Sequence, residues 1–192
     1  MRKLGLQQFA VSVDGYICEE GTEFHRLWQG IDDAELDEHF IGALRRAGTH
    51  IMGRNTYLAM SEFWPSQSQS PNQSVAAIAA IMNDVPKVVF SRSLQSADWP
   101  EARIASGGTV EEIMRLKREP GGEIVAHGGV SFVRSLAALE VVDEYRLYVV
   151  PVAIGSGASL FGTLPRPQTL RLLSAKTFPS GVMEVVYERK GQ

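Results

Sequence analysis

Three short segments place glycine, hydroxyl or arginine side chains directly after apolar runs of the chain. They are Gly53-Arg54-Asn55-Thr56, Ser91-Arg92-Ser93 and Gly128-Gly129. A glycine lets a ligand approach the backbone closely, and the unpaired N–H groups of a following helix favour an anion. Arginine adds a planar fork of donors that matches a phosphate. Three such segments in one small chain indicate a ligand with several phosphates, and a dinucleotide fits best.

These segments need strands that end directly before them and hold them in place. The hydrophobic pattern of the sequence predicts such strands. We expect strands at residues 6–13, 50–53, 87–91 and 123–126, and helices at residues 33–47, 75–82, 131–139 and from residue 55 to about 60. A capping box at Thr109 and Glu112 predicts one more helix. Residues 16–31 and 65–74 are expected to be loops.

The last third of the chain has a different pattern. Strands are expected at residues 144–150, 170–178 and 182–189, and Pro179-Ser180-Gly181 turns the last two into a hairpin. The whole pattern predicts an α/β fold with a mainly parallel central sheet flanked by helices and an antiparallel C-terminal hairpin. A length of 192 residues favours a single domain over residues 1–192.

Composition excludes several classes of function. The chain is 44% hydrophobic and 21% charged with a net charge of −3, so no overall basic field attracts nucleic acid. No apolar run is long enough to span a bilayer. The single cysteine, Cys18, fits a reducing compartment, and we expect a cytoplasmic protein. The four histidines are scattered, so no metal site is expected.

The motifs together carry a family resemblance. Ile51-Met52-Gly53-Arg54-Asn55-Thr56-Tyr57 resembles the strand-to-helix signature of dihydrofolate reductases. The rest is more similar to the reductase domain of the bifunctional riboflavin-biosynthesis deaminase-reductase and its stand-alone bacterial homologues. That resemblance rests on five motifs in the family's order: Ser12-Val13-Asp14-Gly15-Tyr16-Ile17, Pro86-Lys87-Val88-Val89-Phe90-Ser91-Arg92, His127-Gly128-Gly129, Val142-Asp143-Glu144-Tyr145-Arg146-Leu147 and Pro151-Val152-Ala153-Ile154-Gly155-Ser156-Gly157. The family implies a dihydrofolate reductase-like fold.

The resemblance also assigns a set of NADPH-binding residues. Arg54 and Thr56, after Gly53, would bind phosphates, and Ser91 and Arg92 would bind the adenosine 2′-phosphate. Arg54 and Arg92 could instead be ordinary surface charges.

Further along the cofactor, the Gly128-Gly129 turn and a helix capped by Ser131 would receive the pyrophosphate, with Phe132 also among the cofactor residues. His127 departs from the related pattern, and we interpret it as structural. Ala10 and Ile17 would border the nicotinamide, although both could equally be core residues. Trp28 would close over a planar substrate or simply cover the core.

Two carboxylates are candidates for a catalytic role. Asp37 precedes Arg54 by the same interval as the substrate-binding carboxylate precedes the matching arginine in dihydrofolate reductase, although it also fits a solvated acidic helix face. Asp14 is the rival, despite the frequency of Asp-Gly in turns.

The predicted function is NADPH-dependent hydride transfer to a small pteridine-like or aminopyrimidine-like heterocycle. A non-catalytic NADPH-binding or sensing module is the alternative. A homodimer is expected, with no nucleic-acid or membrane partner.

Overall fold

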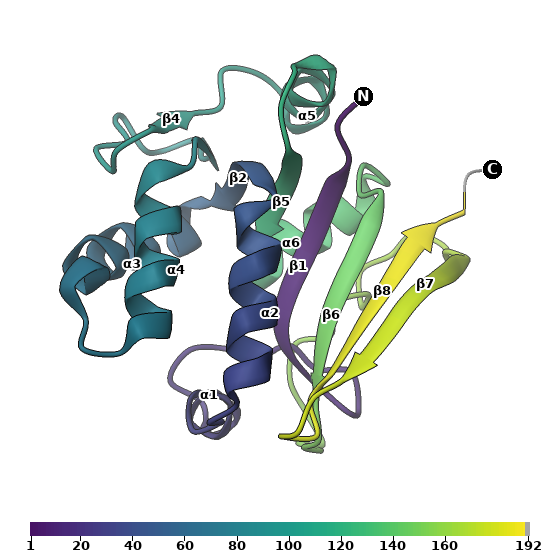
Figure 1. Cartoon of the computed structure of the whole chain (residues 1–192). Helices are drawn as coiled ribbons and strands as arrows, with labels where there is room; N and C mark the ends of the chain where they lie inside the picture. Colours follow the sequence, from purple (N-terminus) through teal and green to yellow (C-terminus); the bar gives the residue numbers. More distant parts are fainter. Residues whose placement is uncertain (191–192) are drawn as a thin grey trace. The chain divides into compact units, whose positions relative to one another are not determined.

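The computed structural model describes residues 1–190, which fall into two compact units. Unit 1 comprises residues 1–3 and 36–127, and unit 2 comprises residues 4–35 and the chain from residue 128 onward. Strands and helices alternate along most of the chain, and the final strands are antiparallel (Figure 1). The predicted mixed α/β architecture with mainly parallel strands is therefore confirmed. The expectation of a single domain stays a prediction.

Unit 1 contains four parallel strands in the order β4-β3-β2-β5. The buried segments Ile51-Met52, Val88-Val89 and Ile124-Val125-Ala126 form continuous apolar runs, as expected for parallel strands with both faces covered. The elements of this unit are the larger part of α2 (Ala34–Arg45), β2 (Ala47–Gly53), α3 (Arg54–Ser66), η1 (Gln67–Gln69), α4 (Gln73–Asp84), β3 (Lys87–Phe90), β4 (Ala102–Ile104), α5 (Thr109–Arg118) and β5 (Glu123–His127).

Unit 2 contains the order β1-β6-β8-β7, in which β1 and β6 are parallel and the two later pairs are antiparallel. A bulge between Gln8 and Val11 interrupts the register of β1, and Ala10 within it has a φ of 54°. The buried residues Ala10, Phe24 and Val150 form a core cluster. The elements are β1 (Leu4–Ser12), α1 (Glu23–Gln29), α6 (Val130–Ala138), β6 (Glu144–Val150), β7 (Leu170–Thr177) and β8 (Met183–Arg189).

A buried lysine closes one end of the unit 1 core. Lys87 is 1% exposed, and its Nζ donates to the carbonyl oxygens of Asn83, Val85 and Pro100 at 3.1, 2.7 and 2.9 Å. The ammonium also lies 4.6 Å from the ring centroid of Trp99. Burial lowers the pKa of Lys87 to about 8, against the attraction of Glu101 and Asp84. The side chain therefore ties the end of α4 to the segment before β4.

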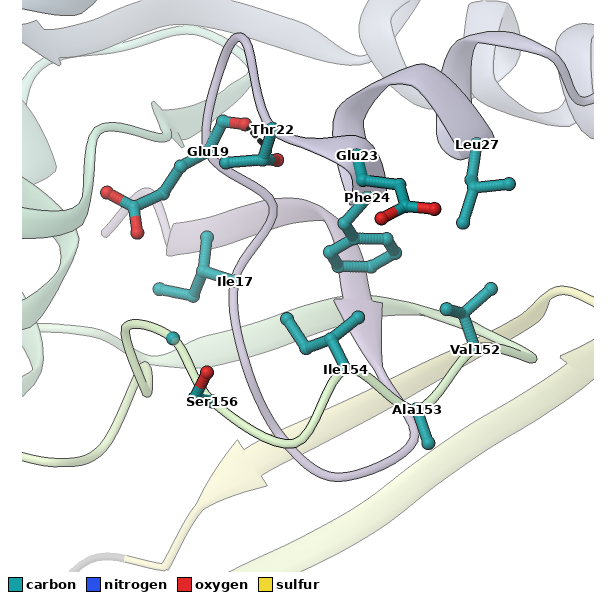
Figure 2. A pocket seen from close by; sticks show the side chains of 11 residues that line it. Ile17, Glu19, Thr22, Glu23, Phe24, Leu27, Val152, Ala153, Ile154 and Ser156 are labelled. Carbon is teal, nitrogen blue, oxygen red and sulfur yellow. Dashed lines mark hydrogen bonds between the residues drawn. The ribbon is translucent and has the colours of Figure 1, made fainter.

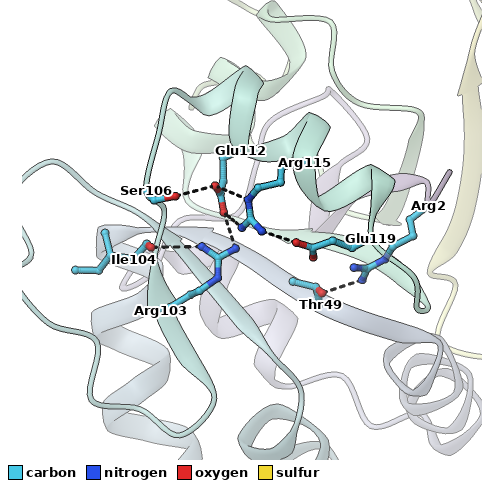
Figure 3. A network of polar contacts seen from close by, with 8 residues as sticks. All are labelled: Arg2, Thr49, Arg103, Ile104, Ser106, Glu112, Arg115 and Glu119. Atoms are coloured by element: carbon cyan, nitrogen blue, oxygen red, sulfur yellow. Dashed lines mark hydrogen bonds and ion pairs between the residues drawn. The ribbon is translucent and has the colours of Figure 1, made fainter.

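An ion-pair network on α5 fixes β4 in the same unit (Figure 3). The buried Glu112 carboxylate accepts from Arg103 at 2.5 Å and from Arg115 at 2.6 Å, and Arg115 also pairs with Glu119. Burial alone would raise the pKa of Glu112, but hydrogen bonds from Arg115 and Arg103 hold it below its ordinary value. Glu112 thus pairs with Arg103 instead of completing a capping box, and the cap of α5 is Gly108.

Several local expectations were wrong. Residues 16–31 were expected to be a loop but contain α1, whose cap Thr22 accepts a hydrogen bond from the His25 N–H at 3.2 Å. Residues 65–74 were also expected to be a loop, yet α3 continues through Pro65 to Ser66 and is followed by η1. The short strand β4 was not expected. The helix α6 is capped by Gly129 and begins at Val130, so Ser131 is not its cap.

Candidate functional site

The junctions after β2 and β3 lie at the same edge of the unit 1 sheet. Gly53 and Phe90, the last residues of these two strands, are paired in register. Because parallel strands end together at this edge, Arg54 and the segment Ser91-Arg92-Ser93 leave the sheet as neighbours. The Arg54 Nη1 donates to the Ser93 Oγ at 3.0 Å, which confirms that the two segments touch. We call Gly53, Arg54, Ser91, Arg92 and Ser93 the arginine edge.

The arginine edge has the chemistry of a phosphate-binding surface. Arg54 and Arg92 are exposed, and Arg54 begins the 13-residue helix α3. The cap residue Gly53 has no side chain, so the cap itself makes no side-chain hydrogen bond to the first turn of α3. These amides carry the positive end of the helix dipole. Two guanidinium groups and a helix N-terminus at one edge are suited to bind an anion with more than one phosphate.

The hydroxyl groups near this edge have different roles. The Ser91 Oγ accepts hydrogen bonds from the N–H groups of Ser93 and Leu94, at 3.2 and 3.1 Å, and so shapes the turn after β3. Thr56 is half-buried in the first turn of α3. Ser91 therefore positions Arg92 in addition to any contact of its own with a ligand.

Unit 2 carries the glycine turn of the expected pyrophosphate site. Gly129 has φ 89° and ψ 104°, a conformation that favours glycine, and its carbonyl accepts from the Phe132 N–H at 3.0 Å. Gly128 precedes it with ordinary space around its α-carbon. Ser131 is exposed and Phe132 half-buried on the first turn of α6. The turn needs glycine at position 129 whatever it binds.

The residues expected beside the nicotinamide lie together in unit 2. Ala10 is fully buried, and its carbonyl accepts from the Cys18 N–H at 2.9 Å. Ile17 is 3% exposed and forms a bridge with Val11. Trp28 packs against the cluster that contains Ala10, so in this structure it covers the core.

The two candidate catalytic carboxylates have contrasting surroundings. Asp14 accepts hydrogen bonds from the N–H groups of Ile154 and Gly155, at 3.2 and 2.7 Å. A hydrogen bond with Ser12, and then those from the two backbone groups, lower the pKa of Asp14. A carboxylate held in this way anchors a loop and is a poor proton donor. Asp37 is half-buried on α2, and its side chain makes no hydrogen bond or ion pair with any other residue among 1–190.

A buried histidine pair was not anticipated as a unit. The rings of His50 on β2 and His127 on β5 have centroids 4.4 Å apart and planes 59° apart. Burial lowers the pKa of His127 to about 4. Burial, and then repulsion from His127 and Lys87, holds the pKa of His50 well below its ordinary value. Both rings are therefore neutral core groups, which agrees with the structural interpretation of His127.

Unit 2 also contains a cavity of about 390 Å³ that the sequence motifs did not predict (Figure 2). Its lining comes from the segment around α1 and from the loop after β6, and it includes Ile17. Phe24 and Leu27 are three residues apart, which is the spacing of one helical turn and the only sequence feature in residues 16–31 that indicated a helix beside this cavity. A single turn is too short to predict a helix from periodicity. Among the described residues, no group of three or more His, Cys, Asp or Glu side chains could hold a metal ion. No helix within residues 1–190 is long and apolar enough to cross a membrane.

Solved structures of other proteins share the fold of this chain. A protein assigned to riboflavin biosynthesis from Shewanella sp. PV-4 superposes with a TM-score of 0.73 at 22% identity, covering 97% of this chain and 99% of that one. The deaminase/5-amino-6-(5-phosphoribosylamino)uracil reductase of Thermotoga maritima gives 0.67 at 15% identity, covering 98% of this chain and 57% of its own. Dihydrofolate reductase from Enterococcus faecalis, complexed with NADP(H), gives 0.57 at 16% identity over 98% and 97% of the two chains. The fold is therefore that of the dihydrofolate reductases.

Sequence comparison is more specific. Residues 5–183 match the RibD C-terminal domain, and the chain belongs to that family. The uncharacterized Bacillus subtilis protein YyaP is 30% identical over 182 residues, covering 95% of this chain and 93% of its own. YwjB of the same organism is 29% identical over 182 residues, with 95% and 96% coverage. The resemblance inferred from the motifs is confirmed.

Proposed function

We propose that the protein is an NADPH-dependent reductase that transfers a hydride to a small planar heterocycle. The observation that carries this proposal is the arginine edge, where the Arg54–Ser93 hydrogen bond joins two phosphate-binding candidates beside the N-terminus of α3. Family membership and a dihydrofolate reductase fold support the same chemistry. In such an enzyme the cofactor supplies the hydride, and the protein positions both reactants.

Different residues of the chain would bind different parts of the cofactor and the substrate. Arg54, Arg92 and the amides of α3 would bind phosphates, whereas the turn at Gly129 would accept the pyrophosphate against its backbone. Ala10 and Ile17 would provide an apolar wall for the nicotinamide. Asp37, a half-buried carboxylate without a partner among the described residues, would hold a ring N–H of the substrate and favour ring protonation.

Cofactor preference tests the proposal directly. We expect NADPH to bind about 10- to 100-fold more tightly than NADH, because a charge-assisted hydrogen bond to the 2′-phosphate contributes about 1.5–3 kcal/mol. Fluorescence titration of the purified protein with both cofactors measures this ratio, and Arg92→Gln should reduce it. Equal dissociation constants for the two cofactors would contradict the assignment of Ser91 and Arg92.

Turnover is tested separately by following NADPH absorbance with a panel of pterins, dihydrofolate and aminopyrimidines. Oxidation of NADPH by one of these substrates is expected. Tight NADPH binding without oxidation by any of them would favour the non-catalytic NADPH-binding module.

A further inference from the structure

The loop after β6 is held to the rest of unit 2 by two ionisable side chains of opposite sign. At the start of the loop, the Asp14 carboxylate accepts hydrogen bonds from the N–H groups of residues 154–155. Further along, the Arg134 Nε donates to the Ser159 carbonyl at 2.6 Å. The 156–158 segment therefore lies between two fixed points of the main chain.

Holding this loop is the one polar contact that the structure gives to the Arg134 side chain. Arg134 is half-buried on the second turn of α6. Its guanidinium makes no other hydrogen bond and no ion pair with any residue among 1–190. In contrast, Arg103 and Arg166 both pair with glutamates. No carboxylate offsets the desolvation of the Arg134 charge, so the contact with the loop is the reason the structure offers for an arginine at this position.

The segment between the two fixed points lies on the main chain that follows β1. The Ile17 N–H donates to the Ala158 carbonyl at 2.8 Å, and Tyr16 forms an antiparallel bridge with Ser159. Gly157 has a φ of 154°, and an added carbon there would lie 3.3 Å from the Tyr16 Cβ. A shift of the segment would therefore shift Ile17 as well.

The other end of this connection is the helix that begins at the glycine turn. The cap of α6 is Gly129, and Arg134 is on the same helix within unit 2. In the proposed function, the turn receives the pyrophosphate and Ile17 borders the nicotinamide. The hydrogen bond between Arg134 and Ser159 therefore joins the elements that would bind two parts of one cofactor.

The fold of the loop does not depend on Arg134. Leu160 is 2% exposed and fixes the next part of the loop in the core. The ring of Phe161 packs edge-to-face on Tyr145, with centroids 5.2 Å apart. Removal of the guanidinium should therefore loosen the 156–158 segment locally and leave the chain folded.

We propose that Arg134 is a positioning residue that fixes the nicotinamide end of the cofactor site through the loop after β6. A wall that is already fixed costs less to order when the ring binds. Arg134 therefore raises the affinity for the nicotinamide ring and leaves the affinity for the adenosine phosphates unchanged. The proposal rests on the proposed function, which places the nicotinamide beside Ile17.

Calorimetric titration of the full chain with NADPH and with 2′-phospho-ADP-ribose, which lacks the nicotinamide ring, tests the proposal. The ratio of the two dissociation constants measures the contribution of the ring. Arg134→Met should reduce this ratio about 10-fold by weakening NADPH alone, as loss of a charge-assisted hydrogen bond predicts. Arg134→Lys keeps a charged donor and should restore part of the ratio. Arg166→Met removes an exposed arginine paired with Glu140, and as the matched control it should leave both constants unchanged.

The outcomes separate this proposal from the proposed function. An unchanged ratio in folded Arg134→Met would overturn it, and so would equal weakening of both ligands, which would assign Arg134 to the pyrophosphate. Hydrogen exchange of the Ile17 amide, measured by NMR without cofactor, should be faster in Arg134→Met than in the wild type, and unchanged protection would also overturn the proposal. If the wild type bound neither ligand, the reductase proposal would be wrong, whereas the exchange rates would still decide whether Arg134 fixes the loop.

Discussion

At the scale of single residues, the two acidic candidates are distinguished by their partners. The backbone groups that bind Asp14 belong to the loop at residues 154–155, so this side chain has a structural task already. Asp37 is on the helix before the strand that leads to Arg54 and is free to receive a ligand. We therefore favour Asp37 over Asp14 for substrate binding.

Replacement of Asp37 by asparagine should lower turnover far more than NADPH affinity. Asparagine keeps the size of the side chain but cannot hold the negative charge that favours ring protonation. Steady-state kinetics should show a loss of roughly 10²- to 10⁴-fold, the usual range for acid–base catalysis. A variant that turns over at nearly the wild-type rate would make Asp37 part of a solvated helix face.

The histidine pair should make the fold sensitive to acid. Between about pH 6.5 and pH 4 the unfolded chain protonates His127, whereas the folded chain does not, so the free energy of unfolding falls as the pH falls. Full loss of the His127 contribution amounts to about 3 kcal/mol, from roughly 1.4 kcal/mol per pH unit. Urea unfolding across this window measures the slope. His127→Phe should flatten it, and an unchanged slope in that variant would assign the acid sensitivity elsewhere.

At the scale of elements, predictability followed the length and pattern of each segment. The strands β2, β3 and β5 were predictable because each contains a short buried apolar run, Ile51-Met52, Val88-Val89 and Ile124-Val125-Ala126. In contrast, α1 and β4 were not, because seven and three residues carry too little periodicity. Pro65 predicted a break, yet it lies in the last turn of α3, where its ring has little helix left to disrupt.

Residues of the candidate site could be predicted from the sequence only where glycine or a polar side chain directly follows a strand. Gly53, Arg54 and Arg92 could be found because glycine and arginine after an apolar run is a local signal. The cavity beside Ile17 could not, because its walls come from segments more than 120 residues apart in the sequence, roughly the distance from α1 to the loop after β6. Pairing of His50 with His127 likewise depends on the β2–β5 register.

The turn that begins α6 provides a prediction at this scale. Gly129→Val should abolish NADPH binding in a chain that still folds, because a branched side chain is strained at φ 89° and would occupy the space required by a pyrophosphate. Gly108→Ala is the matched control, since Gly108 has a φ of −62° and an added carbon there would meet nothing within 4 Å. Fluorescence titration measures affinity, and circular dichroism confirms folding. Retained affinity in folded Gly129→Val would make the turn purely structural.

At the scale of the whole molecule, the end of the unit 2 sheet indicates how copies could assemble. The strand β7 is last in its sheet order, and most of its residues are exposed. Leu172 and Leu173 are 53% and 41% exposed, which is unusual for adjacent leucines at a sheet edge. A second copy of this chain would cover them.

We expect a homodimer that buries β7. Sedimentation at micromolar concentration should give twice the monomer mass, and Leu172→Lys with Leu173→Lys should give a monomer because two charges would be buried in the interface. Leu139→Lys, at a 45% exposed leucine after α6, is the control and should leave the dimer intact. A monomeric wild-type protein would contradict the expectation.

The reactivity of the buried Lys87 ammonium can report how often the structure around it opens. Lys190 is exposed and should react readily with an acylating reagent. Lys87, held by three carbonyls, should react only in molecules whose α4 end has separated from the segment before β4. Mass spectrometry of the labelled peptide would then time this local opening in an unmodified chain.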